Sequence, residues 1–218
     1  MYWPVTMINE YFIADTVGAA EMDLLWAQGW RHFGSYFFRY SLAEHDGILC
    51  HVLPLRLKPG SFALSRSQHR VLKRNRDVKV VIRDAVIDSA KEALFLRHRE
   101  RFKQNVPDSL YDFMSESPAT IPCRNQEICV YDGGRLLAVS FLDIGEKATS
   151  AVYAAFEPAE AQRSLGIFTM LCAIEQSRGL GCSYYYPGYA YREPSMYDYK
   201  KRFSGLESYD WHAKWSPL

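Results

Sequence analysis

The chain has 218 residues, 48% of them hydrophobic and 23% charged, so it is long enough to bury a core and too apolar to stay disordered. Its formal net charge of +1 excludes a global basic field, and any contact with nucleic acid must come from a local patch. No stretch approaches the ~20 apolar residues of a membrane span. Five cysteines without metal-finger spacing indicate free thiols, so we expect a cytoplasmic protein with no membrane partner.

The predicted elements alternate between helices and strands. Ser65 is a good N-cap, Gly29 and Pro59-Gly60 end elements, and Asp132-Gly133-Gly134 marks a hairpin turn. In chain order we expect a helix over 19–28, strands over 30–40 and 48–57, a basic helix over 65–76, a strand over 78–82, a helix over 88–102, strands over 127–131, 135–142 and 150–156, a helix over 167–175, a strand over 182–186, a helix over 195–203 and a strand over 207–211.

Strands that meander and then end in a crossover helix are typical of a mixed sheet. We therefore predict an α+β fold, with a mixed sheet and flanking helices preceded by a smaller N-terminal α/β module. The expected boundary separates an N-terminal module over 1–104, which carries the basic helix, from an acyltransferase-like module over 105–218.

The run Arg163-Ser164-Leu165-Gly166 lies between a predicted strand and a predicted helix. Such a junction directs free N–H groups and the positive end of the helix at one point, which suits a phosphate. The loop resembles the pyrophosphate loop of GNAT acyltransferases, where a small residue follows two positions after the glycine. Here that residue is Phe168, whose ring should crowd a pyrophosphate, so the acyl donor need not be coenzyme A. An ordinary turn with a surface arginine remains the alternative.

The basic helix carries a second candidate site. Arg66, Arg70 and Arg74 recur every four residues and Lys73 joins them, so the four cations form one stripe. Because aligned cations repel one another, a nucleic-acid backbone would stabilise the stripe. The alternative is a solvated face that Asp77 and Asp84 partly neutralise.

A third candidate lies in the tyrosine-rich run 184–191. Strand alternation puts Tyr184 and Tyr186 on one face and Tyr185 on the other, and Gly188 allows backbone to approach a substrate. In the predicted helix that follows, Lys200 shares a face with Met196 and could bind a phosphate or a carboxylate. The alternatives are a tyrosine-rich core and a lysine that extends to solvent.

Several motifs occur in the order and spacing of one family: Ser65 to Asn75, Asp132 to Val139, Ser150 to Tyr153 with Phe156 and Pro158, Arg163 to Gly166, Tyr186 to Tyr189, and Met196 with Tyr199-Lys200 and Phe203. Over roughly Ala27 to Glu207 the chain resembles the aminoacyl-tRNA–protein transferases, which include arginyl-tRNA–protein transferases and bacterial aspartate/glutamate leucyltransferases. The resemblance implies a GNAT-like catalytic half without coenzyme A. It also implies transfer of an amino acid from charged tRNA to an amine of a peptide, protein or small molecule, with aminoacyl-tRNA as co-substrate and no cofactor.

The resemblance also implies roles for individual residues. The expected tRNA-binding residues are Arg66, Arg70, Lys73, Arg74, Arg163, Ser164 and Gly166. The expected catalytic residues are Tyr189, Lys200 and Tyr186. The aminoacyl pocket is expected to include Tyr153, Phe156, Gly188 and Met196.

The chain departs from the family at one place. Family members carry an N-terminal cysteine cluster, linked to an iron–sulfur or other metal site, before a Pro-x-Arg strand. Here the strand survives as Pro54-Leu55-Arg56, but the stretch 41–50 has a single cysteine, Cys50. We therefore expect no metal and leave the acceptor open. Two alternatives remain: a coenzyme-A-dependent N-acyltransferase and a non-catalytic RNA-binding module.

Overall fold

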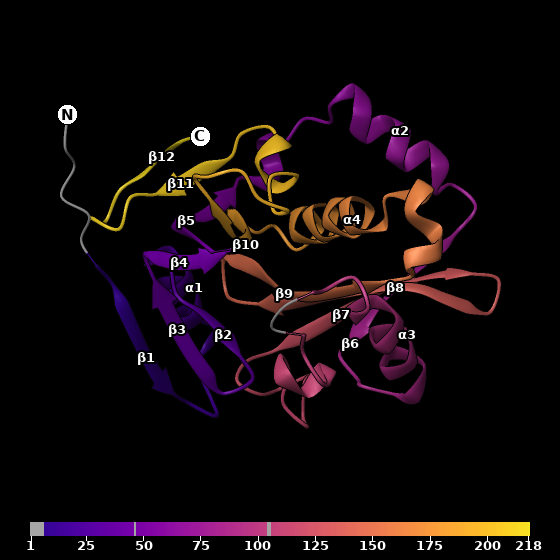
Figure 1. Cartoon of the computed structure of the whole chain (residues 1–218), viewed down its shortest axis with the longest axis horizontal. Coiled ribbons are helices and arrows are strands. Elements are labelled where there is room, and N and C mark those ends of the chain that lie inside the picture. The colour runs from indigo at the N-terminus through magenta and orange to yellow at the C-terminus, as the bar shows by residue number, and fades with distance from the viewer. Residues whose placement is uncertain (1–6, 46, 104–105) are drawn as a thin grey trace.

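A computed structural model describes residues 7–45, 47–103 and 106–218 (Figure 1). Its α-helices are α1 (Ala19–Ala27), α2 (Arg66–Arg74), α3 (Ser89–Arg99) and α4 (Leu165–Gly179). Its strands are β1 (Asn9–Ile13), β2 (Arg31–Phe33), β3 (Tyr36–Tyr40), β4 (Leu42–His45), β5 (Ile48–Leu57), β6 (Lys79–Asp84), β7 (Asn125–Asp132), β8 (Arg135–Ile144), β9 (Ala148–Phe156), β10 (Tyr184–Tyr191), β11 (Glu207–Tyr209) and β12 (Trp215–Pro217). Short 3-10 turns cover Pro59–Ser61, Leu110–Asp112, Pro158–Arg163 and Lys200–Arg202.

A nine-stranded sheet organises the described part of the chain. Its strands follow the order β12-β11-β5-β10-β9-β8-β7-β6, and β4 pairs with β5 off this path. Strands β9 and β10 run parallel because α4 crosses over between them, while their other neighbours in the sheet are antiparallel. The predicted α+β class with a mixed sheet is therefore confirmed.

A second, three-stranded sheet in the order β1-β3-β2 lies beside the large sheet with α1 (Figure 1). The predicted boundary at 104/105 falls outside the described residues. Strands from both sides of it share one sheet, because β6 pairs with β7 and β5 pairs with β10. The division into two modules stays a prediction.

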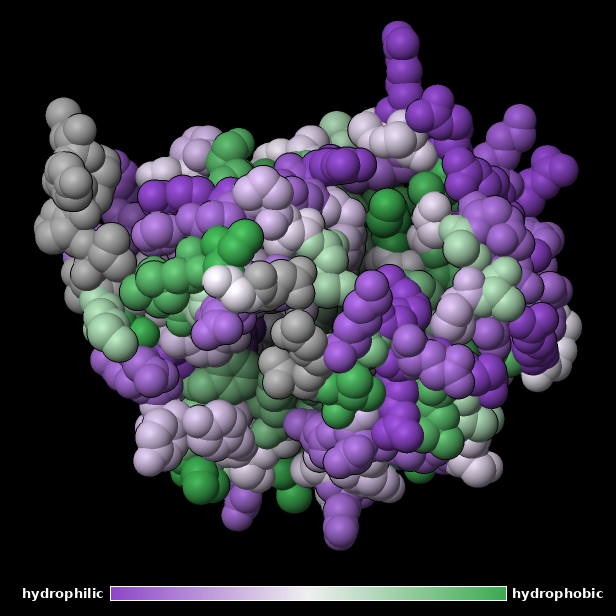
Figure 2. Space-filling view, viewed as in Figure 1, coloured by the Kyte–Doolittle hydropathy of each residue, from purple (hydrophilic) through white to green (hydrophobic). Residues whose placement is uncertain are grey.

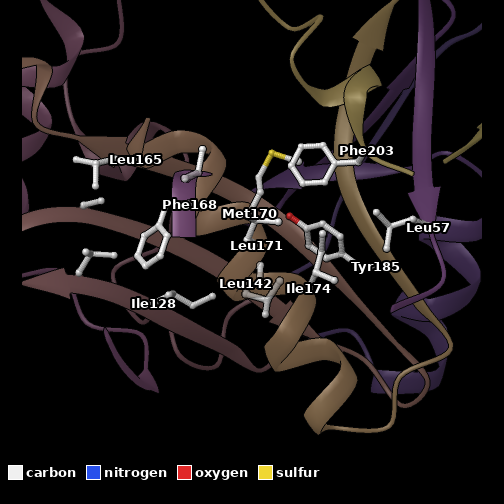
Figure 3. Close-up of a cluster of buried hydrophobic side chains, with 14 of the residues drawn as sticks. Leu57, Ile128, Leu142, Leu165, Phe168, Met170, Leu171, Ile174, Tyr185 and Phe203 are labelled. Carbon is white, nitrogen blue, oxygen red and sulfur yellow. The ribbon is translucent and has the colours of Figure 1, made fainter. Parts of the chain in front are cut away.

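The two faces of the large sheet carry different cores. Helix α4 covers one face, where Tyr185 packs with Leu57, Ile174 and Phe203 (Figure 3). On the other face α3 packs over Phe141 and its neighbours, and Tyr186 joins a cluster around Trp26 of α1. The predicted alternation is thus confirmed: Tyr185 and Tyr186 lie on opposite faces of β10.

Local signals predicted most elements well. Ser65 is the N-cap of α2, as expected, and forms a capping box with Gln68; Val71 is buried beneath that helix. The predicted single strand over 30–40 is instead a hairpin, because Gly34 adopts a φ of +52° and turns the chain.

The predicted helix over 195–203 is wrong. The segment forms turns and the 3-10 turn Lys200–Arg202, since so short a segment gains little from helix formation and is held by tertiary contacts. Met196 is accordingly 48% exposed.

No described helix combines the length and the apolar character that crossing a membrane requires.

Candidate functional site

Strands β9 and β10 separate after their first three residues. They pair from Tyr184 opposite Ala148 to Tyr186 opposite Ser150, and the pairing then ends. Strand β10 stays paired with β5 as far as Tyr191, with an irregularity in the pairing between Tyr185 and Gly188. The following residues of β9, 151–154, are only half-buried. The large sheet therefore opens at its centre, and we call this place the β9–β10 divergence.

Lys200 lies at the β9–β10 divergence. Its Nζ donates a hydrogen bond to the carbonyl of Tyr189 over 3.0 Å and lies 5.2 Å from the centre of the Tyr197 ring. Gly188 makes room for it: its φ is +92°, and a Cβ there would be 3.4 Å from Nζ. Burial, aided by the charge of Arg31, lowers the pKa of Lys200 to about 8. An amine with this pKa can lose and regain a proton near neutral pH.

The side chain of Tyr189 has a structural partner. Its hydroxyl donates to the carbonyl of Gly29 over 2.6 Å, which ties β10 to the turn before β2. Burial raises the pKa of Tyr189, and it also raises that of Tyr40, whose ring is 5.4 Å away, to about 12. Both hydroxyls stay protonated at neutral pH. Tyr186 is buried on the same face of β10.

Arg31 lies between Tyr186 and Tyr189. Its guanidinium carbon is 5.2 Å from the centre of the Tyr186 ring and 5.4 Å from that of Tyr189. The residue is 6% exposed. Sequence reasoning missed Arg31, although an arginine placed directly after Trp30 in the aromatic run 30–40 was a usable signal.

The residues expected in the aminoacyl pocket do not all gather at one point. The Tyr153 ring stacks on Phe113, with 3.8 Å between centres, and its buried hydroxyl has no partner among the described residues. Burial raises the pKa of Tyr153, and an electrostatic interaction with Tyr197 adds to this shift. Phe156 instead lies against Gly166, where a Cβ would be 3.1 Å from the ring, and Met196 is exposed.

The basic helix and the loop before α4 are in direct contact. Nη1 of Arg74 donates to the Gln162 carbonyl over 2.6 Å, and Nδ2 of Asn75 donates to the Arg163 carbonyl over 2.8 Å. Arg66, Arg70, Lys73 and Arg74 are exposed. Figure 2 shows hydrophilic side chains projecting from this corner of the molecule, over α2. An open hollow of about 620 Å³ beside them is lined by Arg70, Lys73, Arg74, Arg76 and Asp77.

The loop 163–166 has the backbone conformation expected of an anion-binding loop, but the Arg163 guanidinium in it is already paired with carboxylates. Ser164 adopts a left-handed φ of 54°, and its carbonyl accepts the N–H groups of Ile167 and Phe168. The N–H groups of Leu165 and Gly166 therefore have no acceptor inside the helix. The Arg163 guanidinium, however, contacts carboxylates, with Asp77 at 2.9 Å, Glu160 at 3.2 Å and Asp132 at 3.6 Å. These pairs raise the pKa of Arg163.

The expectation that Phe168 crowds the loop is wrong. Phe168 is 6% exposed and packs in the core beneath α4 (Figure 3). One turn into the helix, the side chain at this position points toward the sheet, so the Phe168 ring does not obstruct the N–H groups of the loop.

One buried group in the described residues has the ligand types of a metal site: His32, Cys123 and Asp143, whose ligand atoms lie within 4.8 Å of one another. Nε2 of His32 is 2.7 Å from Asp143, and Asn125 donates to the other Asp143 oxygen over 2.8 Å. Burial, with the charge of Asp143, raises the pKa of the Cys123 thiol. The hydrogen bond between His32 and Asp143 connects β2 to β8. The expectation that the chain binds no metal stays a prediction.

Comparison with known proteins places these features in context. The family model "Arginine-tRNA-protein transferase, C terminus" matches residues 90–210. The chain is 33% identical over 195 residues to the aspartate/glutamate leucyltransferase of Stenotrophomonas maltophilia strain K279a, covering 84% of this chain and 76% of the relative. It is 26% identical over 207 residues to the protein of that name from Leptospira interrogans, covering 92% and 79%.

Solved structures are more distant. FemX has a TM-score of 0.49 at 11% identity, covering 86% of this chain and 65% of its own. A GCN5-related N-acetyltransferase from Kribbella flavida has a TM-score of 0.41 at 16% identity, covering 72% and 54%.

Proposed function

The chain belongs to the arginine-tRNA–protein transferase family, and from this premise we propose that it transfers an amino acid from an aminoacyl-tRNA to the amino group of an acceptor. The relatives named above are leucyltransferases, so leucyl-tRNA is the first donor to test. The ester of the charged tRNA already activates the amino acid, so the reaction needs no further cofactor. Charged tRNA is a cytoplasmic substrate, which supports a cytoplasmic location.

One observation carries this proposal: the basic helix is hydrogen-bonded to the loop that begins α4. The stripe of Arg70, Lys73 and Arg74 thus continues into the N–H groups of Leu165 and Gly166. A tRNA acceptor end presents consecutive phosphates, and a row of cations beside free backbone donors suits them. Arg163 joins this surface only where a phosphate displaces a carboxylate from it.

The reaction then takes place at the β9–β10 divergence. The neutral amine of the acceptor attacks the ester carbonyl carbon, and a tetrahedral oxyanion forms. The C–O bond breaks, an amide remains, and the ribose hydroxyl of the tRNA leaves with a proton. The nitrogen must lose a proton during these steps, and Lys200 is placed to accept it when neutral. Tyrosine hydroxyls held protonated by burial, such as that of Tyr153, can donate to the oxyanion.

An isotope-transfer assay tests the proposal. The protein is incubated with leucyl-tRNA labelled in the leucine and a peptide whose N-terminal residue is aspartate, and label in the peptide is measured. Label in the peptide supports the proposal. Saturable binding of acetyl-coenzyme A without any transfer from tRNA would instead favour the coenzyme-A-dependent alternative. Tight tRNA binding without transfer to any amine would favour the RNA-binding module.

A further inference from the structure

Arg31 is a buried cation whose hydrogen bonds are incomplete. Its Nη1 donates to the Trp30 carbonyl, while Nε and Nη2 are shielded from solvent and have no partner among the described residues. Nε and Nη2 lie on the same edge of the guanidinium. That edge offers two parallel N–H bonds, the arrangement that binds a carboxylate through both of its oxygens.

The charges around Arg31 favour an anion. Its neighbours Tyr186 and Tyr189 are neutral, and the positive charge of Lys200 repels that of Arg31. Asp143, the acid whose charge acts on Arg31, already lies 2.7 Å from Nε2 of His32 and accepts a hydrogen bond from Asn125. A guanidinium buried without a paired acid is costly, and the cost falls when an anion enters.

The position of Arg31 separates it from the expected path of the tRNA. It lies on the Tyr186 face of β10 and packs with the N-terminal segment, whereas α2 and α4 cover the opposite, Tyr185 face. The two faces adjoin at the β9–β10 divergence, where the pairing between these strands has ended. A donor that enters from α4 and an acceptor that enters from the Arg31 side would therefore meet at Lys200.

We propose that Arg31 binds the side-chain carboxylate of an acidic N-terminal residue in the acceptor. This inference rests on the proposed function, because it assigns the acceptor to the Arg31 face and its amine to Lys200. Since Nε and Nη2 are shielded from solvent, the entering carboxylate must part the aromatic side chains around them. Arg31 is then the residue that distinguishes an acidic acceptor from its amide counterpart.

The test uses four peptides that differ only in an N-terminal Asp, Asn, Glu or Gln, with the full chain as wild type, Arg31→Met and Arg31→Lys. Arg56→Met is the matched control. Arg56 also lies between two aromatic rings, 4.1 Å from the centre of Tyr184 and 4.3 Å from that of Trp215, but it has its own carboxylate, Glu207, at 2.6 Å. Transfer is measured as kcat/KM for each peptide, and binding without tRNA is measured by calorimetry.

Wild type should favour Asp over Asn on the order of 100-fold, as expected for a charged hydrogen-bonded pair. Arg31→Met should reduce this ratio to within a few-fold by losing the Asp reaction and should leave the KM for leucyl-tRNA unchanged. Arg31→Lys should keep part of the ratio, and Arg56→Met all of it. Retained Asn transfer by Arg31→Met confirms that the variant is folded.

Some outcomes would overturn the inference. An Asp preference that survives in Arg31→Met rejects it, and so does a raised KM for leucyl-tRNA with an unchanged ratio. Failure of the proposed function is separate: absence of transfer to every peptide, with Asp-peptide binding that still depends on Arg31, would reject the transfer reaction and keep the carboxylate site. If neither transfer nor Arg31-dependent binding occurs, both fall.

Discussion

Lys200 donates a hydrogen bond to the carbonyl of Tyr189 at the point where β10 leaves β9. The contact joins a 3-10 turn near the end of the chain to the centre of the large sheet. It holds an amine whose pKa is lowered to about 8, mainly by burial. The position and the protonation of this amine lead to the first prediction.

We expect the rate of transfer to rise with pH and to level off above about 8. Below that pH Lys200 is protonated and cannot accept a proton, whereas above it the neutral amine can. Lys200→Met should lower the rate by roughly 10²-fold and remove this titration. Single-turnover rates between pH 6 and 9 would be measured, with corrections for ester hydrolysis. Hydroxylamine should serve as acceptor, because a peptide amine titrates in the same range.

The same pKa predicts a pH dependence of stability. The folded chain releases the Lys200 proton near pH 8, and the unfolded chain releases it near the ordinary value of 10.5. Between these values the unfolded state binds more protons, so this group makes the free energy of unfolding rise with pH. Denaturant unfolding at pH 7.5, 9 and 10 should show a rise in wild type that Lys200→Met lacks. Equal slopes in the two proteins would mean that Lys200 titrates normally.

Tyr189→Phe should lower stability more than it lowers catalysis. The hydroxyl bonds to the Gly29 carbonyl, so its loss should cost about 1 kcal/mol and a few degrees of Tm. Transfer at saturating substrate should stay within a few-fold of wild type. Thermal melting and kcat are the measurements. A 100-fold fall in kcat at unchanged Tm would instead assign the hydroxyl to the reaction.

The basic stripe should contribute to tRNA binding through charge alone. Arg70→Ala should weaken binding and reduce the slope of log K against log salt by about 0.7 for each phosphate that the variant no longer neutralises. Lys147→Ala is the matched control, because Lys147 precedes β9 at the end farthest from the Arg163 loop. Filter binding from 50 to 200 mM salt would measure both slopes. Identical slopes for Arg70→Ala and wild type would remove the stripe from the interface.

Asp77→Asn should tighten tRNA binding by a few-fold. The change removes the acid that pairs with both Nη atoms of Arg163 and leaves that cation freer to meet a phosphate. Because Asp77 is exposed, the melting temperature should change little. The same binding assay measures the effect, with Asp84→Asn as the control. Weaker binding would mean that the Asp77 pair itself positions the loop.

The sequence by itself determined the helices and hairpins that depend on caps, residue spacing and turn residues within a short segment. The Ser65 cap and the four-residue spacing of Arg66, Arg70 and Arg74 predict α2, and the Gly133-Gly134 turn predicts the β7–β8 hairpin. Alternation along β10 placed Tyr185 and Tyr186 on opposite faces. Each of these features depends on residues within one or two turns of helix or a few positions of strand, so the order of the residues is sufficient.

Tertiary structure alone decided which groups meet. Arg163 pairs with Asp77 across 86 residues, the Tyr189 hydroxyl reaches Gly29 across 160, and Arg31 lies between two tyrosines of a distant strand. Lys200 donates a hydrogen bond to the Tyr189 carbonyl, and its segment forms a 3-10 turn instead of the helix that the local sequence predicts. Such contacts arise from the packing of two sheets and the separation of β9 from β10. No local pattern encodes them, because their free energy exists only when the distant partners are assembled.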